Sequence, residues 1–269
     1  MALKIDGILE RMGLFKDTSV GFALSGGGAK GFSHIGVLMA FERSGIKPDI
    51  LAGVSAGSIA GVLYGAGLRP TDIIKCFTDS SKFADFAEWA LPKEGFLKLD
   101  RFGRLLEEWL PVRYLEELKI PTVVCATDFD HGKSVGWSKG EIVPRVLASC
   151  SIPIIFNPQK INGVHYVDGG VLHNLPAWAI RPYCKTLYGC NCSPLRKATE
   201  GSKTVMDIAY RTFHLMSKAN TPQDIRLCDH LIQVYDISHV SIFELSSLQK
   251  GVMAGYEAAM KVLDKILND

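Results

Sequence analysis

Long hydrophobic runs are missing from this sequence of 269 residues, in which no stretch of 18 apolar residues occurs. A helix that crosses a bilayer needs about 20 such residues, so we expect no membrane span. The first ten residues also lack the cationic segment and apolar stretch of a secretory leader. We therefore expect a cytoplasmic protein.

An excess of charge of one sign is missing too, because 30 Lys and Arg residues oppose 28 Asp and Glu residues. The net charge of +2 gives no electrostatic reason to expect a nucleic-acid partner. Linkers, charge blocks, repeats and low-complexity segments are absent as well, and 47% hydrophobic residues supply a large core. We expect one domain over residues 1–269, with no signal for an oligomeric state.

The cysteines do not form a disulfide pattern, since there are seven of them and no export signal. Reduced, buried thiols are the expectation. Cys190 and Cys192 are the closest pair, but their spacing differs from Cys-x-x-Cys and no second ligand pair follows. Asp128, Asp130 and His131 cluster just before a glycine, Gly132, as turn residues do. We expect neither a metal nor a cofactor.

The order of apolar segments predicts an α/β fold with a mainly parallel sheet, because strands alternate with helices. Strands are predicted over 19–24, 50–52, 120–126, 134–137, 159–161, 164–167, 185–188 and 231–235. Helices are predicted over 33–44, 58–67, from 69–72 onward, 100–110, 144–151 and 248–267.

Local signals mark several ends of these elements. Gly45 stands where a helix C′ glycine belongs, and Thr71 and Asp100 are predicted N-caps. Asn162-Gly163 predicts a two-residue hairpin turn. Residues 81–99 carry four aromatic side chains among charged ones, a pattern typical of either an amphipathic flap or a packed surface helix.

One serine stands out because of its surroundings. Ser55 is the centre of Gly53-x-Ser-x-Gly57, with an apolar run before it and a helix pattern after it. A strand, a sharp turn and a helix around such a serine form a nucleophile elbow, where small residues relieve crowding. Ser55 is therefore the candidate nucleophile.

A glycine-rich loop precedes it in the chain, at Ser25-Gly-Gly-Gly-Ala-Lys-Gly31. Consecutive glycines before a helix can turn their N–H groups toward an anion or a developing oxyanion. Gly26, Gly28 and Gly31 also match the dinucleotide fingerprint, which requires an acidic residue at the end of the second strand. Asp49 lies before that strand and Ser55 after it, which leaves the nucleotide hypothesis as a remote alternative.

The general base is less clearly marked. None of the histidines has a flanking signature, and the candidates are His34, His131, His165, His173, His214, His230 and His239. Asp168 follows the predicted hairpin and precedes Gly169-Gly170, which permit the close approach of another backbone or of a substrate. Asp168 is therefore the better candidate.

These three motifs together resemble bacterial patatin-like phospholipases. The similarity runs from about residue 19 to 182, and residues 183–269 are expected to complete the domain. It includes Ala148-Ser-Cys-Ser-Ile-Pro153 and Asn174-Leu-Pro176. The resemblance implies a three-layer α/β/α sandwich and a Ser-Asp dyad without a catalytic histidine. Many relatives have aspartate or asparagine in place of Ser25.

The resemblance further implies a lipid acyl hydrolase that cleaves phospholipids, lysophospholipids or related esters, with transient contact to a membrane surface. Asp168 would accept the proton of Ser55, and the N–H groups of Gly27 and Gly28 would hold the oxyanion. Lys30 would help to fix this loop, or be a solvated helix-start residue. We expect a carboxylate, with a reference pKa of about 4, to rely on direct geometry and partial desolvation rather than on a matched pKa.

Other functions stay open. A non-catalytic lipid- or acyl-binding relative would keep the pocket without the reaction. An acyltransferase would pass the acyl group to an alcohol or thiol, and such enzymes generally need a histidine at the site.

Overall fold

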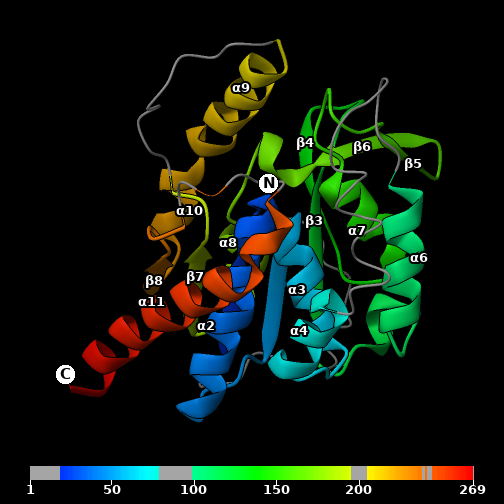
Figure 1. Cartoon of the computed structure of the whole chain (residues 1–269). Coiled ribbons are helices and arrows are strands. Elements are labelled where there is room, and N and C mark those ends of the chain that lie inside the picture. Colours follow the sequence, from blue (N-terminus) through cyan, green and yellow to red (C-terminus); the bar gives the residue numbers. More distant parts are fainter. Residues whose placement is uncertain (1–18, 79–98, 195–204, 238–239, 241–243, 269) are drawn as a thin grey trace.

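The computed structural model describes residues 19–78, 99–194, 205–237, 240 and 244–268 (Figure 1). The predicted flap or surface helix at 81–99 falls outside these ranges except for Leu99. The described residues form one eight-stranded sheet with helices on both faces. The strands are β1 (Val20–Leu24), β2 (Ile50–Val54), β3 (Thr122–Asp128), β4 (Lys133–Trp137), β5 (Gln159–Ile161), β6 (Val164–Asp168), β7 (Thr186–Asn191) and β8 (His230–Gln233).

The strand order is β5-β6-β3-β2-β1-β7-β8, with β4 also paired to β3. The pairs β3–β2, β2–β1, β1–β7 and β7–β8 are parallel. The pairs β3–β4, β3–β6 and β5–β6 are antiparallel. The predicted mainly parallel sheet is therefore confirmed, and its antiparallel part is confined to one side.

Helices cover the sheet unequally. The α-helices are α2 (Phe32–Arg43), α3 (Ala56–Gly65), α4 (Pro70–Thr78), α6 (Asp100–Trp109), α7 (Ile142–Cys150), α8 (Ala177–Ile180), α9 (Val205–Ala219), α10 (Thr221–Arg226) and α11 (Leu248–Asn268). On one face, α2, α3, α4, α6, α7 and α11 share the larger core, and α2 and α11 pack side by side (Figure 1). On the other face, α8 and α10 share the smaller core.

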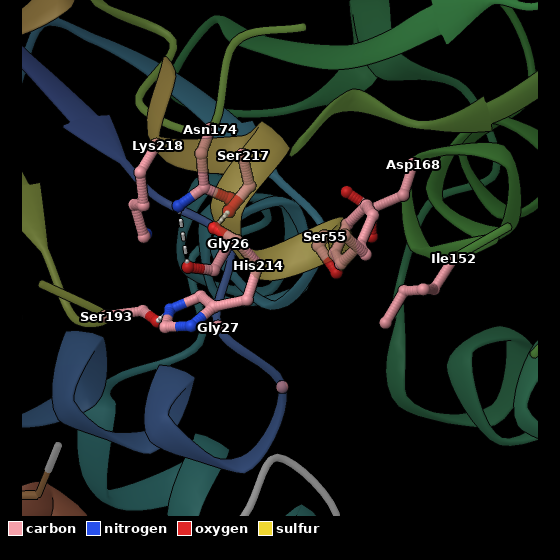
Figure 2. A pocket seen from close by; sticks show the side chains of 12 residues that line it. Gly26, Gly27, Ser55, Ile152, Asp168, Asn174, Ser193, His214, Ser217 and Lys218 are labelled. Carbon is pink, nitrogen blue, oxygen red and sulfur yellow. Dashed lines mark hydrogen bonds between the residues drawn. The ribbon is translucent and has the colours of Figure 1, made fainter. Parts of the chain in front are cut away.

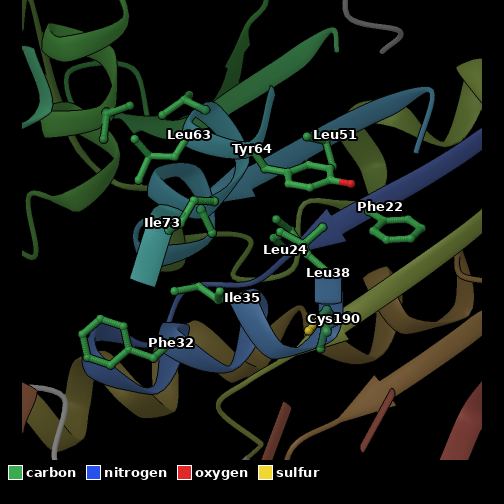
Figure 3. Close-up of a cluster of buried hydrophobic side chains, with 14 of the residues drawn as sticks. Phe22, Leu24, Phe32, Ile35, Leu38, Leu51, Leu63, Tyr64, Ile73 and Cys190 are labelled. Carbon is green, nitrogen blue, oxygen red and sulfur yellow. The ribbon is translucent and has the colours of Figure 1, made fainter. Parts of the chain in front are cut away.

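Strand periodicity divides the side chains between these two cores. Phe22 and Leu24 of β1 face the larger core, whereas Ala23 between them faces the smaller one. In the larger core Phe22 packs edge-on against Phe41, with 4.7 Å between ring centroids, and Leu24 lies among aliphatic residues of α2 and α3 (Figure 3). The three-layer α/β/α architecture is thus confirmed.

Two of the four predicted end signals are right. Gly45 has φ +75° just after α2, and the hairpin residues Asn162 and Gly163 have φ of 50° and 86°. The two predicted N-caps are wrong, Thr71 by two residues and Asp100 by one. Pro70 fits the first helical position, so α4 starts before Thr71, and Asp100 opens α6 in its first turn, after Leu99. Helices α9 and α10 are not among the predicted elements.

The edge of β3 is shared by two strands, and this sharing creates the site. β2 pairs with β3 as far as Val54 opposite Cys125, and β6 pairs with β3 from Asp168 opposite Ala126. Because β4 pairs with both Cys125 and Ala126, it occupies the opposite edge of β3. β2 and β6 therefore meet end to end on one edge of β3, and their last residues become neighbours.

Candidate active site

Ser55 occupies a strained turn directly between β2 and α3. Its φ of 51° and ψ of −123° lie outside the regions that a residue with a side chain prefers. The Ser55 N–H donates to the Ser149 hydroxyl at 2.8 Å, and that hydroxyl donates to the Cys125 carbonyl at 2.6 Å. Ser149, at the end of α7, thus ties the turn to β3.

Gly53 and Gly57, on either side of Ser55, lie where other backbone segments pass too close for a side chain. A Cβ atom at Gly53 would collide with the backbone of Gly57, and one at Gly57 would collide with the Leu24 carbonyl. Both collisions are with backbone atoms, which cannot move aside. The predicted roles of Gly53 and Gly57 as space-making residues agree with this packing.

Asp168 ends β6 and is 2% exposed. One carboxylate oxygen, Oδ1, accepts from the Gly170 N–H at 2.7 Å, and the Asp168 N–H donates to the Ser151 carbonyl at 2.9 Å. Burial raises the pKa of Asp168 to about 7, although the Gly170 N–H and the Ser55 side chain stabilise the ionised form. The Ser55 side chain is therefore close enough to the carboxyl group of Asp168 to lower its pKa.

The glycine loop lies beside Ser55 and offers two N–H groups. Gly28 has φ +57°, which favours glycine. Among the described residues, neither the Gly27 nor the Gly28 N–H has a protein acceptor. The Gly26 N–H instead donates to the Asn174 carbonyl at 3.1 Å, and the Asn174 amide donates back to the Gly26 carbonyl at 3.2 Å. Of the predicted loop residues, Gly27 and Gly28 thus carry the available donors.

The rest of the loop is structural. A Cβ atom at Gly31 would collide with Ala56, so this glycine lets η1 (Gly28–Gly31) pack on the start of α3. Lys30 is only 4% exposed, and the alternative of a solvated residue is therefore wrong. Ser25, the departure from the family pattern, accepts from the Cys192 N–H at 3.0 Å and donates to the Gly26 carbonyl at 3.3 Å. The Ser25 hydroxyl therefore stabilises the conformation of the loop.

These groups line one pocket (Figure 2). The pocket residues are Gly26, Gly27, Gly28, Ser55, Ile152, Asp168, Asn174, Ser193, Phe213, His214, Ser217 and Lys218. The last four belong to α9, and sequence reasoning missed their role apart from naming His214 among the histidines. The amphipathic pattern of residues 205–219 was the available signal for this helix.

His214 is the histidine that lines this pocket. Its Nε2 atom lies 3.4 Å from the Ser193 hydroxyl. Burial, with the nearby charges of Lys218 and Lys30, lowers the pKa of His214 to about 4, so its imidazole is neutral at pH 7.

The other described histidines have partners elsewhere. His34 lies beneath the loop, with Nε2 2.8 Å from the Ser25 carbonyl and Nδ1 3.1 Å from Cys190 Sγ. The remaining described histidines contact Asp128 (His131), Asp130 (His165), Asp224 (His173) and the Tyr188 ring (His230). His239 is outside the described residues.

Three further expectations can be compared with the structure. Asp49, the residue that a dinucleotide site would need, accepts from the Val20 N–H at 2.7 Å at the beginning of β1 and β2, remote from the loop. Across the described ranges, no group of three or more His, Cys, Asp or Glu side chains is arranged to hold a metal. Over the same ranges, no helix has both the length and the apolar character of a membrane span.

Comparisons with known proteins point to one family. A family model described as patatin-like phospholipase matches residues 22–180. An uncharacterized NTE family protein of Mycobacterium tuberculosis (strain H37Rv) is 29% identical over 172 residues, which cover 58% of this chain and 44% of that protein. Lysophospholipase NTE1 of Cryptococcus neoformans is 29% identical over 170 residues, covering 60% of this chain and 10% of the fungal protein. The chain thus spans less than half the length of these curated relatives.

Two solved structures are also similar. VipD from Legionella pneumophila has 15% identity and a TM-score of 0.48, covering 92% of this chain and 67% of the VipD chain. The ExoU–SpcU complex of Pseudomonas aeruginosa gives 16% identity and a TM-score of 0.41, covering 94% of this chain and 52% of the matched chain.

Replacing Ser149 by alanine tests the tie between α7 and the turn. Ser149→Ala leaves the Ser55 N–H and the Cys125 carbonyl buried without this partner. We expect a loss of about 1–3 kcal/mol in the free energy of unfolding, measured with urea, and slower labelling of Ser55 by a fluorophosphonate. Ser151→Ala is the matched control, because the Ser151 hydroxyl donates to the Leu147 carbonyl within α7 and not to the turn at Ser55. Equal slowing of labelling in both variants would contradict this role of Ser149.

Replacing Asp168 by asparagine tests the burial of its charge. The carboxyl pKa is about 4 in the unfolded chain and about 7 in the folded one, so the folded state binds more protons between these pH values. The contribution of Asp168 to the stability of wild type should therefore decrease as the pH rises from 4 to 7, and Asp168→Asn should lack this decrease. We expect the melting temperature of the variant, relative to wild type, to be higher at pH 8 than at pH 5. Asp264→Asn, on the exposed side of α11, is the control. A melting-temperature difference between Asp168→Asn and wild type that does not change with pH would refute the raised pKa of Asp168.

Proposed function

Because the chain belongs to the patatin-like phospholipase family, we propose that it is a serine lipid acyl hydrolase that cleaves the carboxylic esters of phospholipids or lysophospholipids. The observation that carries this proposal is the end-to-end meeting of β2 and β6 on β3, which puts the Ser55 hydroxyl beside the Asp168 carboxyl group. The N–H groups of Gly27 and Gly28, which have no acceptor within the described ranges, support it, since an oxyanion needs such donors.

In the first half of the reaction, Asp168 accepts the hydroxyl proton of Ser55 as the oxygen attacks the ester carbonyl carbon. The carbonyl oxygen becomes an oxyanion and accepts from the Gly27 and Gly28 N–H groups. When the ester C–O bond breaks, Asp168 gives the proton to the leaving alcohol oxygen. In the second half, water gives a proton to Asp168 and attacks the acyl group, and Ser55 regains its proton as the fatty acid leaves.

Burial makes Asp168 a stronger base than the sequence led us to expect. We expected direct geometry to replace a matched pKa, whereas a pKa of about 7 lies close to neutral pH. About half of the Asp168 carboxyl groups are then ionised at pH 7. Each ionised group is a stronger base than a carboxylate with the reference pKa of about 4. Geometry and pKa both favour proton transfer from Ser55.

The substrate class rests on the relatives and on the pocket. The fungal relative is named a lysophospholipase, and the pocket walls include the apolar side chains of Ile152 and Phe213. A lipid substrate would bring a cytoplasmic protein into transient contact with a membrane surface. Both the location and this contact remain proposals.

Acyl transfer is the second candidate, because His214 gives the pocket the histidine that such enzymes generally need. Adding glycerol or a thiol to the assay separates the two reactions. A hydrolase releases free fatty acid at an undiminished rate, whereas a transferase forms the new ester or thioester.

Ser55→Ala tests the nucleophile. We expect activity on a short-chain ester to fall on the order of 10⁶-fold, because the covalent step is lost. A fluorophosphonate should label wild type at Ser55, as located by peptide mapping, and should not label the variant. Ser246→Ala, with an exposed side chain in η5 (Leu245–Ser247), is the control. Near-normal hydrolysis by folded Ser55→Ala would exclude the dyad, and an unlabelled wild type would favour a non-catalytic lipid-binding protein.

The dependence of rate on pH tests the base. Activity requires ionised Asp168, so kcat/KM should fall about tenfold per pH unit below a midpoint near 7. A histidine could produce a similar midpoint, but the low pKa of His214 means that His214→Asn should keep it. A midpoint near 4 in wild type, or one that disappears in His214→Asn, would contradict the role of Asp168.

A further inference from the structure

The pocket has a second polar end, away from Ser55 and Asp168. Figure 2 shows Lys218 and Ser193 on one side of the Asn174–Gly26 contact and Asp168 on the other, with the His214 ring below the contact and next to Ser193. Lys218 is 8% exposed, and its ammonium group has no hydrogen-bond partner among the described residues. An ammonium group buried without a partner costs free energy, so its position calls for a ligand.

The helix that carries Lys218 does not explain this position. Lys218 is in the last turn of α9, where a cation is favourable, but its Nζ bonds no carbonyl there. Burial lowers the pKa of Lys218 to about 8, and of the nearby charged groups Cys192 favours the ammonium form more than Lys30 opposes it. Asp168 is the only acidic residue that lines the described pocket, and it belongs to the other end.

We propose that Lys218 is a specificity residue that binds a phosphate oxygen of the substrate headgroup while the acyl ester lies at Ser55. This inference rests on the proposed function and names the substrate class: esters that carry a phosphate, rather than neutral glycerides. The ammonium group would donate to the phosphate, flanked by the Ser193 hydroxyl. A neutral headgroup would leave the buried ammonium group without its partner, so the pocket discriminates against it.

Kinetics with matched substrates test this assignment. The two substrates are a lysophosphatidylcholine and a monoacylglycerol with the same acyl chain, below their aggregation concentrations. We expect Lys218→Met to reduce the ratio of their kcat/KM values by roughly 10- to 100-fold, mainly through the KM of the phospholipid, because one charge-assisted hydrogen bond is lost. Lys261→Met, an exposed lysine of α11, should keep the wild-type ratio. A ratio within twofold of wild type, or an equal loss on both substrates, would overturn the proposal.

Thermal unfolding distinguishes a headgroup from a free phosphate ion. Measurements use Ser55→Ala protein with and without Lys218→Met, in the presence of glycerophosphocholine or inorganic phosphate. Glycerophosphocholine should raise the melting temperature only while Lys218 is present. Without a ligand, Lys218→Met should melt at or above the temperature of its parent, because it removes a buried charge. A shift with inorganic phosphate alone, or the same glycerophosphocholine shift in both proteins, would overturn the headgroup assignment.

Failure of this inference differs from failure of the proposed function. If wild type hydrolyses esters and is labelled at Ser55, but the substrate ratio does not depend on Lys218, only the headgroup assignment is wrong. If wild type neither reacts with the probe nor hydrolyses an ester, the proposed function fails first. The binding measurement with glycerophosphocholine then still reports on Lys218 independently.

Discussion

The site depends on the way two strands divide one edge of β3. β2 leaves this edge after Cys125, and β6 occupies it from Ala126 onward, running in the opposite direction. A parallel strand and an antiparallel strand that meet in this way bring their carboxyl ends together. Ser55 and Asp168 are 113 positions apart in the chain, yet they become neighbours because Val54 and Asp168 pair with consecutive residues of β3. The carboxyl end of α7 then secures both, through the Ser149 hydroxyl and the Ser151 carbonyl.

Local patterns predicted the elements well where the chain forms them by itself. The strands and most helices followed from apolar periodicity, and Gly45 and Asn162-Gly163 from the positive φ values that their turns need. Ser55, Asp168 and the glycine loop were found as separate motifs, and the resemblance to a family joined them. Their proximity could not come from spacing alone, because it depends on which strand pairs with β3 after Val54.

The sequence was least informative where side chains act through tertiary burial. Nothing in the residues around Asp168 predicts a pKa of about 7, since that shift comes from the walls that exclude water. Lys30 reads equally well as a solvated residue until the fold buries it. Helix α9 lies outside the motifs altogether, and its packing against the turn at Gly169–Val171 brings Phe213, His214, Ser217 and Lys218 into the pocket.

Exclusion of water changes the two ends of the pocket in opposite directions. It raises the pKa of Asp168 and lowers the pKa of Lys218 to about 8, so each group is held less firmly in its charged form than it would be in water. For Asp168, this shift strengthens the base that Ser55 requires. For Lys218, the exclusion of water makes a phosphate group a better partner than water, because the ion pair between ammonium and phosphate would form where few water molecules compete. One physical cause can thus serve both the reaction at Ser55 and the choice of substrate, provided that the substrate reaches from one end of the pocket to the other.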